Sequence, residues 1–488
     1  MGESPSISYG PFRPVLLAAG PVLFASLILA PIPGLPLPSR QAAGVIAWMA
    51  TWWIGEVVPL AVTALLPLIL FPACGILPAA QVALPYANQY VFLMLGGFLL
   101  AEAMQRHRLH RRIALRIVAT VGGGPRRLVL GFMVAAAFLS MWLSNTATAA
   151  MLYPIGMAMV SRVKERAFAP ALMLGIAYAC NIGGMGTLVG TFPNVVLSGM
   201  LPELVPGSSS PDFVTWMARG IPLVVLLVPA GWLLLTRQAF PLAPGGGNGG
   251  QAVRSALQAL GPMTPAERRT ALVFGLTALG WIGRGGMDLG AVRIPGWAEL
   301  LGRSHEIHDS TVAIAAAVAL FLIPAGDPKR RHRRLLGPAA LDAIPWPILI
   351  LFGGGFALAS GFRTSGLDQV LGHGLARLGS SLPLVALLLI IAVSVSLLTE
   401  VNSNTATATA LLPLTAAAAS ALALPAYPLL LTVTFSASCA FMLPTATPPN
   451  AIVFASGSMT LRQMAATGLR MNIIAALVIA ALVWLSTS

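Results

Sequence analysis

Apolar residues fill the chain in runs of roughly 15 to 20 positions, which is long enough for a helix to cross a bilayer core of about 30 Å. A membrane β-barrel would instead show short segments with alternating apolar and polar residues. The pattern therefore predicts an all-α polytopic membrane protein. The expected spans are 14–31, 41–56, 59–74, 89–105, 168–200, 220–237, 270–284, 310–325, 346–362, 427–457 and 467–486.

Composition agrees with this prediction. The 488 residues are 57% hydrophobic and only 9% charged, whereas soluble domains carry about 25% charged residues. The first apolar run follows Arg13 and precedes further runs, so we expect a retained helix and not a cleaved signal peptide. Basic loops that orient a membrane protein explain the net charge of +14, and we expect no nucleic-acid partner.

One short polar phrase occurs twice within the apolar runs. "SNTATAAMLYP" begins at Ser144 and "SNTATATALLP" begins at Ser403, 259 positions later, with eight of eleven positions identical. The phrases lie in the apolar stretches 128–160 and 383–425. Non-helical backbone at membrane depth is tolerated only where protein or a water-filled cavity satisfies it. Stretch 128–160 would suit a re-entrant hairpin or a helix pair. We favour two re-entrant hairpins with the SNT residues at their tips.

Basic residues predict the orientation of these hairpins. The first stretch lies between Arg126–Arg127 and the cluster 162–166, so it should begin and end in the cytoplasm. The second has no Lys or Arg at either end and should enter from the opposite face. With a cytoplasmic N-terminus, the cytoplasmic loops carry 22 of the 29 Lys and Arg residues. We expect this orientation in a plasma membrane, the inner membrane of a bacterium.

The duplication extends beyond the polar phrase. Residues 95–109 align with 353–367 at an offset of 258, and 190–194 align with 446–450 at an offset of 256. Seven arginines lie in or soon after block 95–109, whereas its counterpart is followed by almost none. Because basic residues favour the cytoplasmic side, the corresponding helices should point in opposite directions. This predicts an inverted-topology repeat, the architecture of many secondary transporters.

The repeat divides the chain into five expected regions. They are 1–127 (N-terminal scaffold helices and an interfacial helix), 128–238 (first transport half, with the cytoplasmic-side hairpin 128–160), 239–269 (cytoplasmic linker, flexible at "PGGGNGGQ", 244–251), 270–382 (second scaffold half) and 383–488 (second transport half, with the external-side hairpin 383–425).

The polar phrases suit ion binding. At a hairpin tip one half-helix exposes carbonyl groups and the other exposes N–H groups. Ser, Asn and Thr cap helix starts, and such a tip can bind an anion through N–H groups and a hard cation through oxygens. Ser140 and Thr399 lie four residues before Ser144 and Ser403, so a further hydroxyl is also duplicated.

Two glycine- and proline-rich segments should form the opposite wall. "NIGGMGTLVGTFPN" (181–194) and "MLPTATPPN" (442–450) lie inside apolar runs, and each should break its helix. Small and hydroxyl residues also pack membrane helices together without a ligand. Broken segments at matching places of two inverted halves nevertheless favour a transport site.

These motifs resemble those of the divalent anion/sodium symporter family (DASS, INDY-like), which includes dicarboxylate and sulfate carriers. The paired SNT motifs and "SCAFMLPTATPPNAIV" (438–453) carry the resemblance. Thr445 stands where an aliphatic residue is usual, and Phe192 where many relatives have proline. The resemblance implies eleven spans and two hairpins per subunit, a homodimer, and an elevator motion of a transport domain against a scaffold.

The resemblance also implies the site residues. A first sodium site would comprise Ser140, Ser144, Asn145 and Gly190. A second would comprise Thr399, Ser403, Asn404 and Ala446. The substrate carboxylates would meet Asn145, Thr146, Thr191, Asn404, Thr405, Thr447 and Pro448.

Several other charged residues have open roles. Glu400 adjoins the second tip, where it would sense protons or tune the cation site, or else pair with a buried hydroxyl or amide and hold the hairpin. Glu56 and Glu102 lie near span ends and suit capping or an ion pair. "HEIHD" (305–309) lacks the histidine spacing of zinc proteases and predicts a solvated loop. Residues 106–118 predict a basic amphipathic helix against membrane lipid.

Together these features predict a secondary active transporter and not an enzyme. The expected function is sodium-coupled symport of a small dianion, foremost a C4-dicarboxylate such as succinate, malate or fumarate, with two or more Na⁺ sites. The alternatives are a sulfate or citrate carrier, a sodium-independent exchanger, a channel, and an intramembrane enzyme acting on lipid-linked substrates. That enzyme would need a carboxylate pair, a His cluster or an activated serine at membrane depth, whereas the histidines fall in loops or near span ends.

Overall fold

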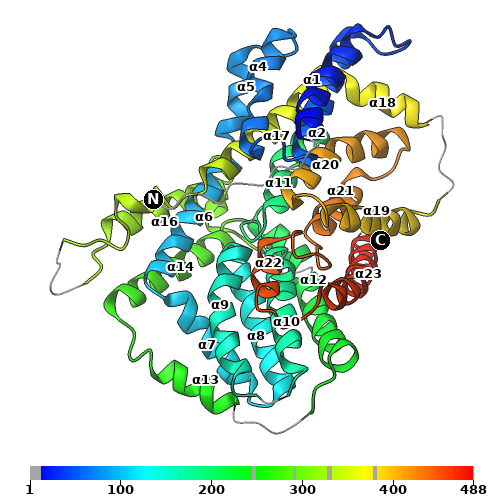
Figure 1. The fold of residues 1–488 in the computed structure, drawn as a ribbon. Helices are drawn as coiled ribbons and strands as arrows, with labels where there is room; N and C mark the ends of the chain where they lie inside the picture. The colour runs from blue at the N-terminus through cyan, green and yellow to red at the C-terminus, as the bar shows by residue number, and fades with distance from the viewer. Residues whose placement is uncertain are drawn as a thin grey trace.

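The computed structural model describes residues 13–163, 165–244, 249–288, 293–326, 332–376 and 382–486, and most of these residues are helical (Figure 1). The strands among them are β1 (Met287–Asp288) and β2 (Arg293–Ile294), which pair antiparallel. The prediction of an all-α protein is confirmed.

One group of helices joins the start of the chain to a segment from its second half. Figure 1 shows the blue N-terminal helices beside the yellow α17 and α18. They share a small hydrophobic core, to which Val45 and Phe71 contribute from the first segment and Leu358 and Phe362 from the second. The group comprises α1 (Arg13–Leu29), α2 (Leu37–Ile54), α3 (Leu60–Thr63), α4 (Leu66–Ala73), α5 (Ala79–Ala83), η1 (Leu84–Ala87), α17 (Trp346–Thr364) and α18 (Leu367–Ala376).

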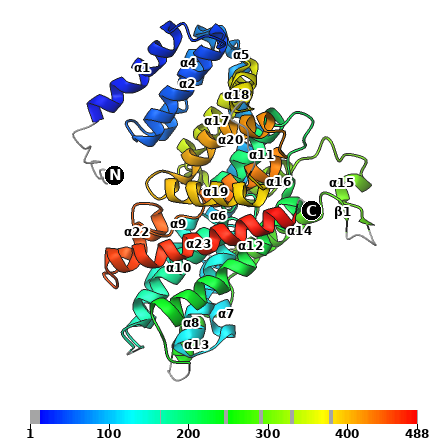
Figure 2. The ribbon, with the colours of Figure 1, turned by 90° about the vertical axis from the view of Figure 1, so that its right-hand side faces the viewer.

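The other helices surround a larger core. Helix α10 is buried along nearly its whole length, and α23 packs against α12 and α19, so the C-terminal helix contacts both halves of the chain (Figure 2). These elements are α6 (Gln89–Arg106), α7 (Leu109–Val121), α8 (Pro125–Ser140), α9 (Asn145–Val160), α10 (Phe168–Gly184), α11 (Phe192–Leu204), α12 (Phe213–Leu233), η2 (Leu234–Ala239), α13 (Gly249–Gln258), α14 (Pro265–Ile282), α15 (Trp297–Leu300), α16 (Asp309–Leu322), η3 (Pro338–Ala340), α19 (Leu384–Thr399), α20 (Asn404–Ala421), α21 (Ala426–Ala437), α22 (Pro448–Phe454) and α23 (Leu461–Leu485).

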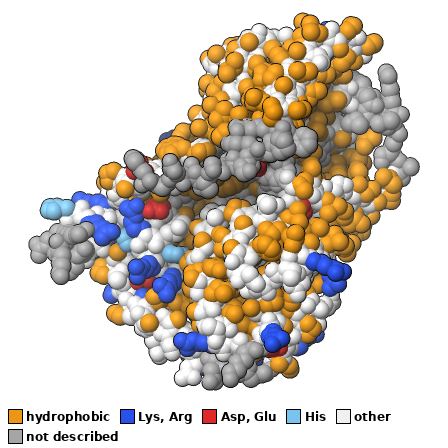
Figure 3. Space-filling view, in the orientation of Figure 1, with side chains coloured by type: hydrophobic (Ala, Val, Ile, Leu, Met, Phe, Trp, Pro, Cys, Tyr) orange, Lys and Arg blue, Asp and Glu red, His pale blue; other side chains and the backbone are white. Residues whose placement is uncertain are grey.

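The surface is that of a membrane protein. Leu272, Leu276 and Leu279 follow one face of α14 and are 59–66% exposed, which suits contact with lipid. Hydrophobic side chains cover much of the face in Figure 3, and Lys and Arg gather in small groups near its left and lower edges. By length and composition, four described helical segments can cross a membrane: Ala79–Arg106, Phe213–Ala239, Trp346–Thr364 and Leu461–Leu485. Six shorter helices are also apolar, and the total of about eleven spans remains a prediction.

Both segments expected to break their helices do so. Residues 185–191 separate α10 from α11, and residues 438–447 separate α21 from α22. The expected span 59–74 is also interrupted, which the sequence analysis did not predict. Pro67 cannot donate to the carbonyl of Thr63, so α3 ends at Thr63 and α4 begins at Leu66.

The linker and the segment "HEIHD" (305–309) also differ from expectation. Residues 249–258 of the expected linker form α13, while 245–248 lie outside the described residues. "HEIHD" is not wholly solvated, because Asp309 is fully buried at the start of α16. Its carboxylate pairs with Arg284 and accepts a hydrogen bond of 2.9 Å from the N–H of Phe213. A buried carboxylate requires such partners.

The basic segment 106–118 contains α7, as expected, but one of its arginines points inward. Arg112 is 6% exposed and forms an ion pair with Glu267, which is 4% exposed. Arg112 also donates to the carbonyl of Gly261 at 2.9 Å. Glu267 belongs to the capping box of α14 with Thr264. The pair therefore joins α7 to the start of α14.

Replacing Arg112 by methionine should lower the free energy of unfolding by about 3–5 kcal/mol, because it leaves Glu267 buried without its partner. Arg111→Met is the matched control, since Arg111 is exposed on the same helix and should cost less than about 0.5 kcal/mol. Denaturant unfolding in detergent measures both. The double variant Arg112→Met/Glu267→Leu should regain part of the loss, and equal losses for Arg111→Met and Arg112→Met would contradict the prediction.

Candidate functional site

The first polar phrase forms the turn between α8 and α9. Helix α8 ends at Ser140 and α9 begins at Asn145, so a carbonyl end and an N–H end meet at residues 141–144. The side chain of Ser144 caps α9 by accepting from the N–H of Ala147 at 3.2 Å. Ser140 is fully buried and donates a hydrogen bond to Oδ1 of Asn145.

The second polar phrase repeats this arrangement between α19 and α20. Thr399 is fully buried and its hydroxyl lies 2.7 Å from Oδ1 of Asn404. The hydroxyl also lies 3.0 Å from the carbonyl oxygen of Ala437, at the end of α21. The duplicated hydroxyl before each SNT motif therefore holds the Asn of that motif in both halves.

The two broken segments also match in backbone conformation and in the hydrogen bonds of one Asn each. Thr191 has φ −144° and ψ 150°, and Thr447 has φ −144° and ψ 151°. Asn194 donates to the carbonyls of Gly184 (3.0 Å) and Thr187 (2.7 Å). Asn450 donates to the corresponding carbonyls, those of Ala440 (3.1 Å) and Leu443 (3.0 Å). The internal repeat read from the sequence is therefore also a repeat of local structure.

All the residues expected to bind substrate line one cavity of about 970 Å³. Four of its lining residues are the N-caps of α9, α11, α20 and α22, so four helices begin at this cavity. Among its described lining residues none is Lys or Arg. The expected site residues on its wall are Ser144, Asn145, Thr146, Gly190, Thr191, Ser403, Asn404, Thr405, Ala446, Thr447 and Pro448.

The oxygens near the first tip fit a hard cation. A Cβ atom added to Gly190 would lie 2.5 Å from the carbonyl oxygen of Gly184, and one added to Gly184 would lie 2.9 Å from Oδ1 of Asn145. The absence of side chains at Gly184 and Gly190 leaves room beside these neutral oxygens, which are of the kind that binds a hard cation. The corresponding positions of the second half are Ala440 and Ala446, so its broken segment carries two extra methyl groups.

Ser140 and Thr399 do not line the cavity. They lie behind Asn145 and Asn404, each with its hydroxyl on the carboxamide oxygen of the Asn. The hydroxyl and carboxamide oxygens are of the kind that binds a hard cation, and Asn145 and Asn404 also line the cavity. The sequence analysis assigned these residues to cations on resemblance, and their placement is compatible with that assignment.

The hydrogen bonds of Glu400 favour the interpretation that it anchors the hairpin. Its carboxylate is 3% exposed and accepts from the consecutive N–H groups of Phe441, Met442 and Leu443 at 2.7–3.0 Å. It also accepts from the side chain of Asn472 on α23 at 2.8 Å. Glu400 therefore ties the second tip to the broken segment and to the C-terminal helix.

Sequence reasoning missed several residues at the cavity. Asn181 is fully buried and donates to the carbonyl of Ala440 (3.1 Å) and to Oγ1 of Thr447 (3.3 Å), so it joins the two halves beside the site. It was part of a quoted motif but had no assigned role. The missed residues that line the cavity itself include Phe98, Gln105 and Asn402.

The two acidic residues expected at span ends both lie at this cavity. Glu102 pairs with Arg106 one helical turn later at 2.8 Å, which confirms the expected ion pair. Glu56 lines the cavity from the N-terminal group and has a φ of +44°, in the left-handed region that few non-glycine residues adopt.

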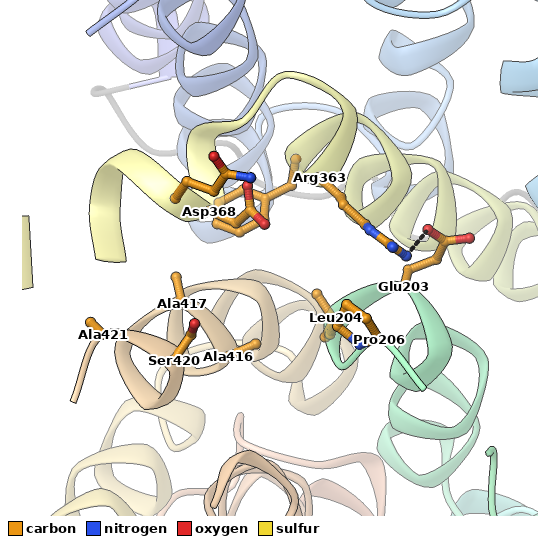
Figure 4. Close-up of a pocket in the computed structure, with 11 residues that line it drawn as sticks. Glu203, Leu204, Pro206, Arg363, Asp368, Ala416, Ala417, Ser420 and Ala421 are labelled. Atoms are coloured by element: carbon orange, nitrogen blue, oxygen red, sulfur yellow. Dashed lines mark ion pairs between the residues drawn. The ribbon is translucent and has the colours of Figure 1, made fainter. Parts of the chain in front are cut away.

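A second cavity, of about 430 Å³, lies away from these residues. Figure 4 shows it between α11, α17, α18 and α20, with Arg363 and Glu203 paired at 3.6 Å across it. Each of these two side chains is 45% exposed. Alanines supply much of the opposite wall, and no residue of the SNT motifs reaches it. The larger cavity is therefore the candidate functional site.

Known proteins are similar to this chain in sequence or in fold. The sodium-dependent dicarboxylate transporter SdcS of Staphylococcus saprophyticus is 40% identical over 495 residues, covering 98% of this chain and 92% of that protein. SdcS of Staphylococcus aureus is 39% identical over 490 residues, covering 96% and 90%. Among solved structures, the YdaH transporter of Alcanivorax borkumensis matches with a TM-score of 0.56 at 16% identity, covering 98% and 97% of the two chains.

MtrF of Neisseria gonorrhoeae matches with a TM-score of 0.53 at 11% identity, covering 94% of this chain and 96% of that one. At these identities the two structures share the fold alone with this protein. Residues 15–486 match the family described as the sodium:sulfate symporter transmembrane region. The chain is therefore a helical membrane transporter that belongs to the sodium:sulfate symporter family.

Proposed function

We propose that the protein couples the import of a C4-dicarboxylate, such as succinate, malate or fumarate, to the entry of sodium. The observation that carries this proposal is the single cavity lined by both SNT motifs and by both threonines of the broken segments. Matched donors from two halves suit an anion with two carboxylates. The dicarboxylate named for the SdcS relatives, which are about 40% identical, supports the same substrate class.

The electrostatics of the cavity favour a dianion that travels with cations. Helices α9, α11 and α20 begin there, and the N-terminal end of a helix stabilises negative charge. The described lining residues include Glu56 and Glu102 and no basic side chain. A dianion here therefore lacks a fixed positive partner, and sodium ions at the two tips would supply the missing charge.

The residues at the two tips would have separate roles in binding the cations and the dianion. The hydroxyls of Ser140 and Thr399 hold Asn145 and Asn404, and sodium bound beside these oxygens fixes the two turns. The dianion docks between the turns, on Thr146, Thr405 and the N–H groups of the helix starts. The bound cations offset its charge, which lowers the cost of carrying the loaded site across the membrane.

The proposed architecture has two moving hairpins that reach the site from opposite faces of the membrane. Regions 128–238 and 383–488 would form a transport domain that moves as an elevator against the scaffold regions 1–127 and 270–382 of a homodimer. The N-terminus would be cytoplasmic, in a bacterial inner membrane. Labelling of single cysteines at positions 161 and 422, beyond the far ends of α9 and α20, should place them on opposite sides; labelling from one side would contradict this architecture.

Uptake of radiolabelled succinate into proteoliposomes tests the proposed function. An inward sodium gradient should accelerate uptake at least about tenfold over an equal choline gradient, in keeping with coupling free energies of about 1–3 kcal/mol. Unlabelled malate and fumarate should compete. If uptake were as fast with choline as with sodium and depended on succinate inside the vesicles, the protein would be an exchanger. If only sulfate or citrate competed with labelled succinate, the proposed substrate class would be wrong.

A further inference from the structure

The cavity is larger than a four-carbon dianion requires. Its volume of about 970 Å³ lies at the upper end of the range that holds drug-sized ligands, about 300–1,000 Å³. Total volume therefore cannot select a short dicarboxylate over a longer one. Selection must come from the walls next to the SNT motifs.

One of these walls is aromatic. Phe192 follows Thr191 directly and lines the cavity together with Phe98. Its ring stands edge-to-face against Phe98 of α6 (centroids 6.2 Å apart) and against Phe352 of α17 (5.8 Å). Phe352 is fully buried and stacks in turn on Phe356 (6.4 Å). Since edge-to-face contacts are favourable aromatic geometries, two of them hold the Phe192 ring in place.

The backbone at Phe192 does not itself require an aromatic residue. Phe192 is the first residue of α11, and the corresponding first residue of α22 is Pro448. The residues before them, Thr191 and Thr447, have the same extended backbone, which is the conformation that a following proline favours. The first position of a helix also tolerates proline. The ring is thus an addition to one half of a site whose other half lacks it.

We propose that Phe192 is a specificity-determining residue, whose ring shortens the substrate cavity and selects C4-dicarboxylates over longer ones. This inference rests on the proposed function. An extra methylene group, as in glutarate, would press against the ring or displace a carboxylate from its donors. The second half has only the small ring of Pro448 at this place, so the limit on substrate length comes from the first half.

The test compares glutarate with succinate in wild-type protein and in Phe192→Pro. The ratio of sodium-driven glutarate uptake to succinate uptake should rise about tenfold or more in the variant, the effect expected when a pocket accommodates one more methylene. Phe192→Leu should shift the ratio in the same direction by less. Thermal stabilisation of the purified protein by each dianion, measured in sodium, gives a second readout that does not depend on transport.

Phe356→Leu is the matched control, because Phe356 belongs to the same row of rings but does not line the cavity. The ratio of glutarate uptake to succinate uptake in Phe356→Leu should equal that of the wild type. An unchanged ratio in Phe192→Pro and Phe192→Leu, or an equal shift in Phe356→Leu, would overturn the inference while leaving the proposed function intact. Wild-type protein without sodium-driven succinate uptake would overturn the proposed function instead.

Discussion

Replacing either Asn145 or Asn404 by alanine is expected to abolish sodium-dependent succinate uptake in a protein that remains folded. Each Asn stands first in its helix, with its carboxamide oxygen on a buried hydroxyl and its side chain on the cavity wall. Each Asn should therefore take part in binding both the cation and the anion at its tip. A hydrogen bond to a charged group contributes about 1.5–3 kcal/mol, so the loss of both roles should lower uptake about 100-fold or more.

Asn88→Ala provides the matched control for these variants. Asn88 caps α6 by accepting from the N–H of Tyr90 at 2.9 Å and does not line the cavity. Its replacement should cost about 1 kcal/mol of stability and leave the sodium-driven uptake of the folded protein unchanged. Gel filtration and thermal unfolding in detergent check that all three variants fold. Normal uptake by Asn145→Ala or Asn404→Ala would refute the assignment of these residues to the site.

The helix breaks and helix starts around the candidate site were predictable from the sequence because their signals are local. A Gly- or Pro-rich segment within an apolar run breaks a helix wherever that run lies, so the interruptions at 185–191 and 438–447 were readable without a fold. The repeated SNT motif likewise marks a helix start through its own side chains. The nearly constant offset between the repeated blocks then indicated which distant segments share a local structure.

Contacts between residues far apart in the sequence could not be predicted from such local signals. "HEIHD" was expected to be a solvated loop because nothing near it in sequence suggests burial, whereas Asp309 meets Arg284 from another helix. Arg112 was counted with the exposed basic residues of its helix, and its partner Glu267 lies 155 positions later. In the linker, the glycine-rich segment 244–251 led to the prediction of a flexible connection, and helix α13 was not predicted. Each error concerns a contact or a helix whose cause lies outside the motif that was read.

Replacing Glu400 by leucine is expected to cause the largest loss of stability of any single change at the site. Its carboxylate is 3% exposed and accepts from three consecutive backbone N–H groups and from Asn472. Each buried donor left without an acceptor costs about 1–3 kcal/mol, so the four together should lower the free energy of unfolding by about 4 kcal/mol or more. Glu400→Gln keeps one acceptor oxygen, so its free energy of unfolding should fall by less. Asn472→Leu should cause the smallest decrease of the three variants.

The first half of the protein shows why an anchor explains Glu400 better than a cation-tuning charge. There the corresponding residue is Met141, and the link between tip and broken segment is a hydrogen bond from the hydroxyl of Thr187 to the Met141 carbonyl. The same connection is thus made without any charge. If Glu400 only anchors, folded Glu400→Gln should show the wild-type dependence of uptake on sodium concentration, as should Thr187→Val, which cuts the matching link. A sodium requirement that rises severalfold in Glu400→Gln but not in Thr187→Val would instead assign the Glu400 charge to the second cation site.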